Sequence, residues 1–69
     1  MMKDVKLLRF IAKKVKKPRE ARNMSQADVF NDIGIHIGRI EAGDRDISIS
    51  TVKAVCNYFG MSISDFFLI

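Results

Sequence analysis

The chain has 69 residues, with twelve Lys or Arg, eight Asp or Glu and a formal net charge of +4. This length allows one small domain with a modest core, which we assign to residues 1–69. A hydrophobic content of 48% and a charged content of 29% are typical of a folded domain and argue against disorder. One Cys and one His exclude an internal disulfide and a four-ligand zinc site, and we expect no metal and no cofactor.

The charge is distributed unevenly along the chain. Residues 1–22 carry nine Lys or Arg against two acids, whereas residues 23–69 carry three against six. A basic first third suits a phosphate backbone, and a solvated helix face explains it equally well. The basic start is followed by no long uncharged apolar run, and no stretch reaches transmembrane length, so we expect a cytoplasmic protein with no membrane contact.

The first predicted helix covers about residues 3–23. Apolar residues recur there at helical spacing and predict a buried face, which consists of Val5, Leu8, Ala12 and Val15. Pro18 lacks a backbone N–H and clashes with the preceding turn. We therefore expect either a kink near residues 14–17 or a break, with a new helix beginning at Pro18.

The second predicted helix begins at Ser25. Ser25 and Asp28 have the spacing of a capping box, in which each side chain accepts a hydrogen bond from the other residue's backbone N–H. Val29 and Phe30 supply the apolar side. We expect this helix to end near residues 31–32.

The third predicted helix covers about residues 33–42, with Asp32 as its N-cap and Gly43 as its C-terminal stop. Gly34 lies where the second and third segments meet, so the pattern predicts a helix-turn-helix over about residues 25–42. At 100° per residue, the inward face carries Ile33, Ile37 and Ile40, and the outward face carries Ile35, Gly38, Arg39 and Ala42, with His36 on a flank. Two short helices that meet at a tight turn, the second with a polar outer face, are typical of a motif that inserts a helix into the major groove of DNA.

Two more helices are predicted after the polar loop at residues 44–46. Ser48 caps a fourth helix that ends at Gly60, and its core positions are Val52, Val55, Cys56 and Phe59. Ser62 and Asp65 have the spacing of a second capping box, for a short fifth helix with Ile63, Phe66 and Phe67 as its apolar residues. We expect the apolar run at residues 66–69 to be at least partly covered from water.

This order of segments resembles the phage-repressor-like, or Xre-type (lambda-repressor-like), helix-turn-helix family. The resemblance covers about residues 5–67 and is carried by residues 19–26, 38–43, 48–52 and 58–67. It implies an all-α, compact five-helix domain that binds operator DNA, usually as a dimer on a palindromic site. It also implies that Gln26 contacts the DNA backbone and braces the recognition helix, and that Arg39 matches the arginine near the end of that helix. By the same resemblance Glu41 is mainly structural, and Arg45 lies in a loop that often contacts phosphate.

Two departures from the family pattern stand out. The region between Gln26 and Glu41 is three residues shorter than usual, and we assign the loss to the turn. Ile33 then falls where the recognition helix usually begins with Ser or Thr. Pro18 replaces an apolar core position of the first helix.

Each candidate contact residue also has a structural interpretation. Gln26 suits DNA contact or an exposed helix start, and Arg39 suits guanine or phosphate recognition or an ion pair with Glu41 or Asp32. Ile35 suits a thymine methyl or packing on the turn, and His36 suits the surface, a phosphate or a base edge. The glycines allow close backbone approach, and basic residues of the first helix favour salt-sensitive attraction to phosphate. The predicted DNA-binding set is Ser25, Gln26, Gly34, Ile35, His36, Gly38, Arg39, Arg45 and Lys17.

The sequence therefore predicts a sequence-specific DNA-binding transcriptional regulator, most simply a repressor, on a palindromic operator in double-stranded DNA. We expect a homodimer that forms through the C-terminal apolar segment, because one such domain gives a small interface. The alternative is a protein-interaction module of the same fold, as in an antitoxin, with DNA binding weak or secondary. We expect no enzyme, since no nucleophile–base pair, metal cluster or phosphate-binding loop is visible.

Overall fold

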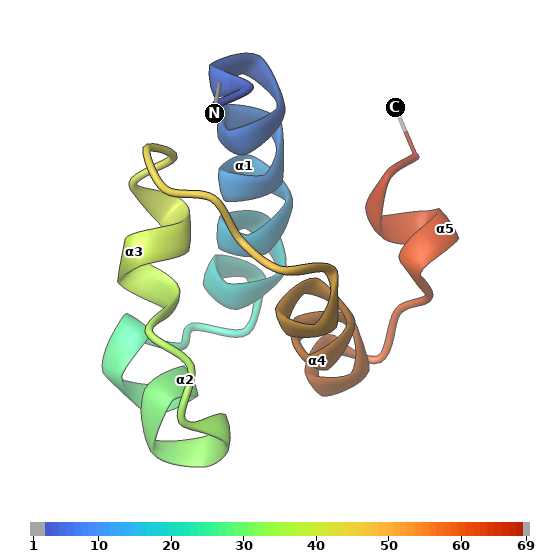
Figure 1. The fold of residues 1–69 in the computed structure, drawn as a ribbon. Helices are drawn as coiled ribbons and strands as arrows, with labels where there is room; N and C mark the ends of the chain where they lie inside the picture. The colour runs from blue at the N-terminus through green and yellow to red at the C-terminus, as the bar shows by residue number, and fades with distance from the viewer. Residues whose placement is uncertain (1–2, 69) are drawn as a thin grey trace.

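Five α-helices and their connecting loops make up residues 3–68, the part of the chain that the computed structural model describes. The helices are α1 (Val5–Ala21), α2 (Gln26–Ile33), α3 (Ile37–Glu41), α4 (Ile49–Phe59) and α5 (Ile63–Phe66), and no strand occurs among the described residues. In Figure 1, α2 and α3 lie on one side of α1, and α5 lies on the other side with α4 below α1. The all-α, five-helix class expected from the sequence is confirmed.

Serine caps set three of the helix starts, as the sequence predicts. The Oγ of Ser25 accepts from the N–H of Asp28 at 3.0 Å, and Asp28 Oδ2 accepts from the N–H of Ser25 at 2.8 Å, so the first capping box is complete. Ser48 Oγ accepts a backbone N–H at 3.1 Å. At Ser62 only one of the two bonds forms, from the N–H of Asp65 to Ser62 Oγ at 3.0 Å. These local bonds explain why the starts of α2, α4 and α5 could be predicted.

The first helix continues through Pro18, so of the two alternatives expected there, the break with a new helix at this residue is wrong. A proline inside a helix costs about 3 kcal/mol or more. Its neighbours offset that cost, because Val15 is fully buried in the core and Arg19 is held by a buried ion pair. Val5 was expected in the core but is 46% exposed, since the first turn of α1 extends beyond the other helices (Figure 1). Ile11, which the predicted face omitted, is buried instead.

One hydrophobic cluster joins all five helices. Its members are Ile11, Val15, Val29, Ile37, Val52, Val55, Cys56, Phe59 and Phe66. The four core positions predicted for α4 are all buried, and burial raises the pKa of the Cys56 thiol. No helix among residues 3–68 has both the length and the apolar character needed to cross a membrane.

The boundary between α2 and α3 differs from the prediction. Helix α2 runs on through Ile33, Gly34 ends it in the left-handed region at φ 70°, and α3 begins only at Ile37. Asp32 does not cap α3, because its Oδ2 accepts a 2.5 Å hydrogen bond from Tyr58 Oη of α4. That bond links α2 to α4, and it raises the pKa of Tyr58.

Candidate nucleic-acid interface

The connection between α2 and α3 is a tight turn of residues 34–36, typical in length of a DNA-binding helix-turn-helix. The three-residue shortening of this region, relative to the family pattern, was expected in the turn. The turn has an ordinary length, however, and α3 has only five residues. The shortening therefore falls on α3. Ile37 is fully buried and Ile40 is half-buried against the core, so these two positions of the predicted inward face are confirmed. Ile33 is also half-buried, but it belongs to α2 and not to α3.

The outer side of α3 forms a ridge between two hollows. Both hollows are lined by His36 and Arg39, and both of these side chains are exposed. One hollow continues to α2, where Gln26, Ala27 and Phe30 line it. The other continues to the loop after α3 and the start of α4, where its lining includes Arg45, Asp46, Ile47, Ser48 and Thr51. The structure thus places Gln26, His36, Arg39 and Arg45 around one surface.

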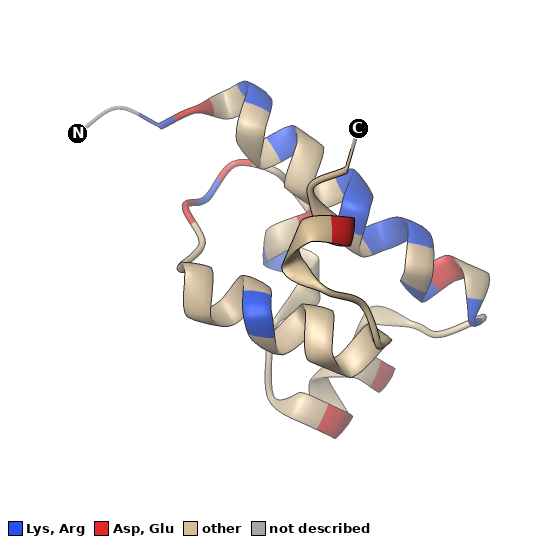
Figure 2. Cartoon of the chain, turned by 90° about the vertical axis from the view of Figure 1, so that its right-hand side faces the viewer, with Lys and Arg blue, Asp and Glu red and all other residues tan. Residues whose placement is uncertain are grey.

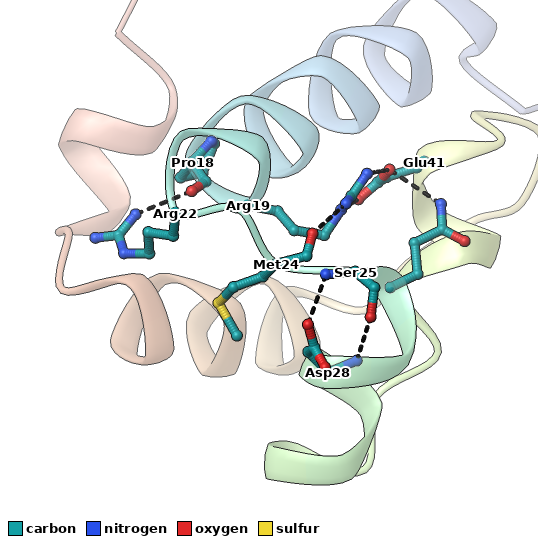
Figure 3. A network of polar contacts seen from close by, with 8 residues as sticks. Pro18, Arg19, Arg22, Met24, Ser25, Asp28 and Glu41 are labelled. Carbon is teal, nitrogen blue, oxygen red and sulfur yellow. Dashed lines mark hydrogen bonds and ion pairs between the residues drawn. The ribbon is translucent and has the colours of Figure 1, made fainter.

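A buried ion pair fixes α3 against α1 (Figure 3). Arg19 donates to both carboxylate oxygens of Glu41, from Nε at 2.7 Å and from Nη2 at 2.9 Å, and its Nη1 donates to the carbonyl of Met24 at 2.6 Å. The two side chains are only 11% and 5% exposed. The hydrogen bond to Glu41 raises the pKa of Arg19 above its ordinary value. Glu41 therefore has the structural role that the family resemblance implies, and Arg39 forms no ion pair with it in the described residues.

Gln26 extends this network to the first turn of α2. Its Nε2 donates to Glu41 Oε1 at 3.1 Å, so one carboxylate connects α1, α2 and α3. The carboxamide lies over Gly38, where an added Cβ would come within 2.7 Å of Gln26 Oε1. The absence of a side chain at residue 38 is therefore what lets Gln26 brace α3.

Phe30 was predicted to belong to the apolar side of α2, yet its side chain is 40% exposed. It stacks on the ring of His36, with 4.4 Å between ring centroids and 25° between ring planes. The stack spans the hollow on the α2 side of the ridge. No sequence pattern indicated it, because the two residues become neighbours only when the turn folds.

The remaining predicted contact residues near the turn have identifiable structural roles. Ser25 caps α2. Gly34 adopts the positive φ that ends α2, and an added Cβ there would meet open space. Ile35 was predicted on the outward face, but it is half-buried and packs against the core, although it also lines a hollow beside Arg39.

Lys17 does not lie on the α3 surface. It lines a separate hollow between α1 and α5, together with Lys14, Pro18 and Met61. The neighbouring Lys14 donates to the carbonyl of Leu68 at 3.0 Å, which also places this side of α1 next to α5. Figure 2 shows that most basic positions follow α1, so α1 rather than α3 carries most of the positive charge.

Two basic residues that the sequence did not single out reach the loop after α3. Lys3 Nζ donates to the carbonyl of Asp44 at 2.7 Å. Arg9 lies against Gly43, where an added Cβ would be 3.5 Å from Arg9 Cγ. Both therefore border the loop that carries Arg45. Helical spacing alone could not have shown which basic residues in and just before α1 do this.

The tight turn between α2 and α3, together with a short α3 that is held in place and exposes Arg39, defines a helix-turn-helix domain. The family model described as "Helix-turn-helix" (HTH_3) matches residues 15–66, which is more than half of the chain. The chain therefore belongs to the Xre-type, lambda-repressor-like helix-turn-helix family, and this membership implies DNA binding. No curated protein and no solved structure gives a significant match.

Proposed function

We propose that this protein is a sequence-specific transcriptional regulator, most simply a repressor, that places α3 in the major groove of operator DNA. The observation that carries the proposal is the exposed Arg39 on a helix that Arg19, Glu41 and Gln26 hold in place. A guanidinium on a fixed helix can donate two hydrogen bonds to guanine, worth about 1–3 kcal/mol of discrimination between bases. Gln26 and Arg45, on either side of the ridge, would contact phosphates and set the register.

A salt titration tests the proposal. We would measure binding to a random-sequence 20-base-pair duplex by fluorescence anisotropy at 50 and 200 mM salt. In sequence-independent binding, Arg39 would contact phosphate in place of guanine. Contacts from Lys3, Arg9, Arg39 and Arg45 to four phosphates then predict a slope of log K against log salt of about −3.6, hence roughly a hundredfold weaker binding at 200 mM. No binding at 50 mM would contradict the proposal.

Paired variants locate the DNA-binding surface. Arg39→Gln removes one positive charge from the ridge, and Lys17→Gln removes one from the side of α1 next to α5. We expect Arg39→Gln to weaken binding at least fivefold and Lys17→Gln to weaken it less than twofold. Equal effects would mean that net charge, rather than the α3 surface, governs binding.

We also propose a homodimer on a palindromic operator. Phe10 of α1 stacks on Phe67 at 6.2 Å between centroids, and next to this pair Leu68 is 69% exposed. Leu7, three residues before Phe10, is on the same side of α1 and is 44% exposed. Pairing this apolar patch with a second copy would remove both leucines from water. In vitro selection should then recover half-sites about 10 base pairs apart, and recovery of single unpaired sites would contradict the dimer.

A protein-interaction module remains the second candidate function, and the length of α3 favours it. Five residues rise only about 7.5 Å along a helix axis, which leaves few positions to read bases. If the chain binds no duplex at low salt and remains folded, this second function replaces the first.

A further inference from the structure

We propose that His36 binds DNA as the protonated imidazolium, and that Phe30 is the positioning residue that holds its ring for this contact. The inference rests on the proposed function, since it concerns the same surface. It adds that DNA binding is coupled to the uptake of one proton from solvent.

The position of His36 suits direct contact with DNA. It is the N-cap residue of α3, and the first residues of a recognition helix are the ones that reach base edges in a helix-turn-helix. Its side chain forms no capping hydrogen bond and is exposed, and it lines both hollows beside the ridge. Its ring nitrogens are therefore available to a ligand.

Phe30 restricts how that ring can lie. The two rings are stacked at 4.4 Å, and Phe30 itself is carried by α2, whose start is fixed by a complete capping box. Stacking covers one face of the imidazole and leaves its edge, which carries the nitrogens, free to donate. An imidazole held in one plane loses less conformational entropy on binding than a freely rotating one.

Three charged side chains share a hollow with His36. They are Arg39 of α3, and Arg45 and Asp46 of the following loop. The other side chains that line the two hollows, from α2, from the turn and from the start of α4, carry no charge. A phosphate brought to this surface adds negative charge and favours the imidazolium, which then donates from both nitrogens. Histidine is the side chain whose charge ordinarily changes between pH 5 and 8.

Proton uptake makes a directional prediction. If the complex holds the proton more tightly than the free protein, affinity rises as pH falls, by at most tenfold per pH unit for one proton. We would measure the dissociation constant for a random-sequence 20-base-pair duplex from pH 8.5 to 5.5 at constant ionic strength. We expect binding to tighten three- to tenfold for the natural chain. His36→Gln keeps a hydrogen-bonding side chain but cannot titrate, and its affinity should stay constant within a factor of 1.5.

Nuclear magnetic resonance gives an independent readout, because His36 is the only histidine in the sequence. The titration midpoint of its ring Cε1 proton should rise by at least 0.5 pH unit when the duplex is added. Phe30→Leu keeps an apolar side chain without a ring, and it should reduce that rise by half or more.

The outcomes separate this inference from the proposed function. DNA binding that is independent of pH, or that keeps its pH dependence in His36→Gln, overturns the inference and leaves DNA binding intact. An unchanged rise of the midpoint in Phe30→Leu overturns the positioning role. No duplex binding at any pH overturns both the inference and the proposed function.

Discussion

The ion pair between Arg19 and Glu41 gives the most decisive prediction for stability. Glu41→Gln keeps the shape of the side chain but removes its negative charge. Arg19, which is only 9% exposed, keeps its positive charge. A buried charge that loses its partner costs about 3–5 kcal/mol. The remaining bond from Arg19 Nη1 to the carbonyl of Met24 relieves part of this cost, so we expect a loss of about 3 kcal/mol.

This loss would be large for a domain of this size. At about 0.05–0.15 kcal/mol per residue, 69 residues give a free energy of unfolding of roughly 3–10 kcal/mol. Urea unfolding followed by circular dichroism would show the midpoint falling by about 3 M, for a slope near 1 kcal/mol per M. Glu20→Gln is the matched control, because Glu20 is exposed on the same helix as Arg19, and it should change stability by less than about 0.5 kcal/mol.

A double variant separates the lost charge from the lost hydrogen bonds. Arg19→Met with Glu41→Leu removes both charges and fills the same space with apolar atoms. Replacing both partners of a buried ion pair is often neutral or stabilising, so most of the loss in Glu41→Gln should be recovered. A Glu41→Gln variant as stable as Glu20→Gln would refute the reasoning, because it would mean that Arg19 is solvated in spite of its burial.

Further predictions concern the interface, the dimer and the core. Arg39→Ala should weaken DNA binding while leaving the melting temperature within about 2 °C, and a collapse in thermal stability would show that Arg39 is structural instead. Gly38→Ala should displace the Gln26 side chain and weaken DNA binding, with little net change in urea midpoint, because a helix gain of up to about 1 kcal/mol offsets a lost hydrogen bond of similar size. Leu68→Asp should shift sedimentation towards monomer, and an unchanged mass would place any dimer contact elsewhere. Because the raised pKa of Cys56 keeps its proton in the folded state, stability should fall as pH rises above about 8.5, and Cys56→Ala should reduce that fall in urea titrations between pH 8 and 10.

The serine-capped starts of α2, α4 and α5 and the core of α4 followed from sequence alone because they depend on local chemistry. The hydroxyl of Ser25 or Ser48 bonds a backbone N–H three residues on, whatever the rest of the chain does. The spacing of Val52 and Val55 likewise defines one face of a helix without reference to its neighbours. The order of these signals was enough to indicate the family.

The boundary of α3 required the tertiary structure. Asp32 is a residue type that commonly caps helices, but the hydroxyl of Tyr58, 26 residues later, donates to its carboxylate. Ile33 continues α2 because its side chain packs against the core, and Gly34 then adopts the positive φ that ends the helix. The local sequence does not show that the Tyr58 hydroxyl, rather than a backbone N–H at a helix start, would bind this carboxylate.

The composition of the interface was decided by which elements the fold brings together. Lys17 and Arg9 belong to the same basic helix, yet one faces α5 and the other lies against the loop after α3. The stack of Phe30 on His36 likewise forms only across the folded turn. Residue order by itself determined that there are five helices and that serines cap three of them, since these caps depend on bonds within a few residues. Packing between helices decided which side chains share a surface, because that depends on contacts between residues far apart in the chain.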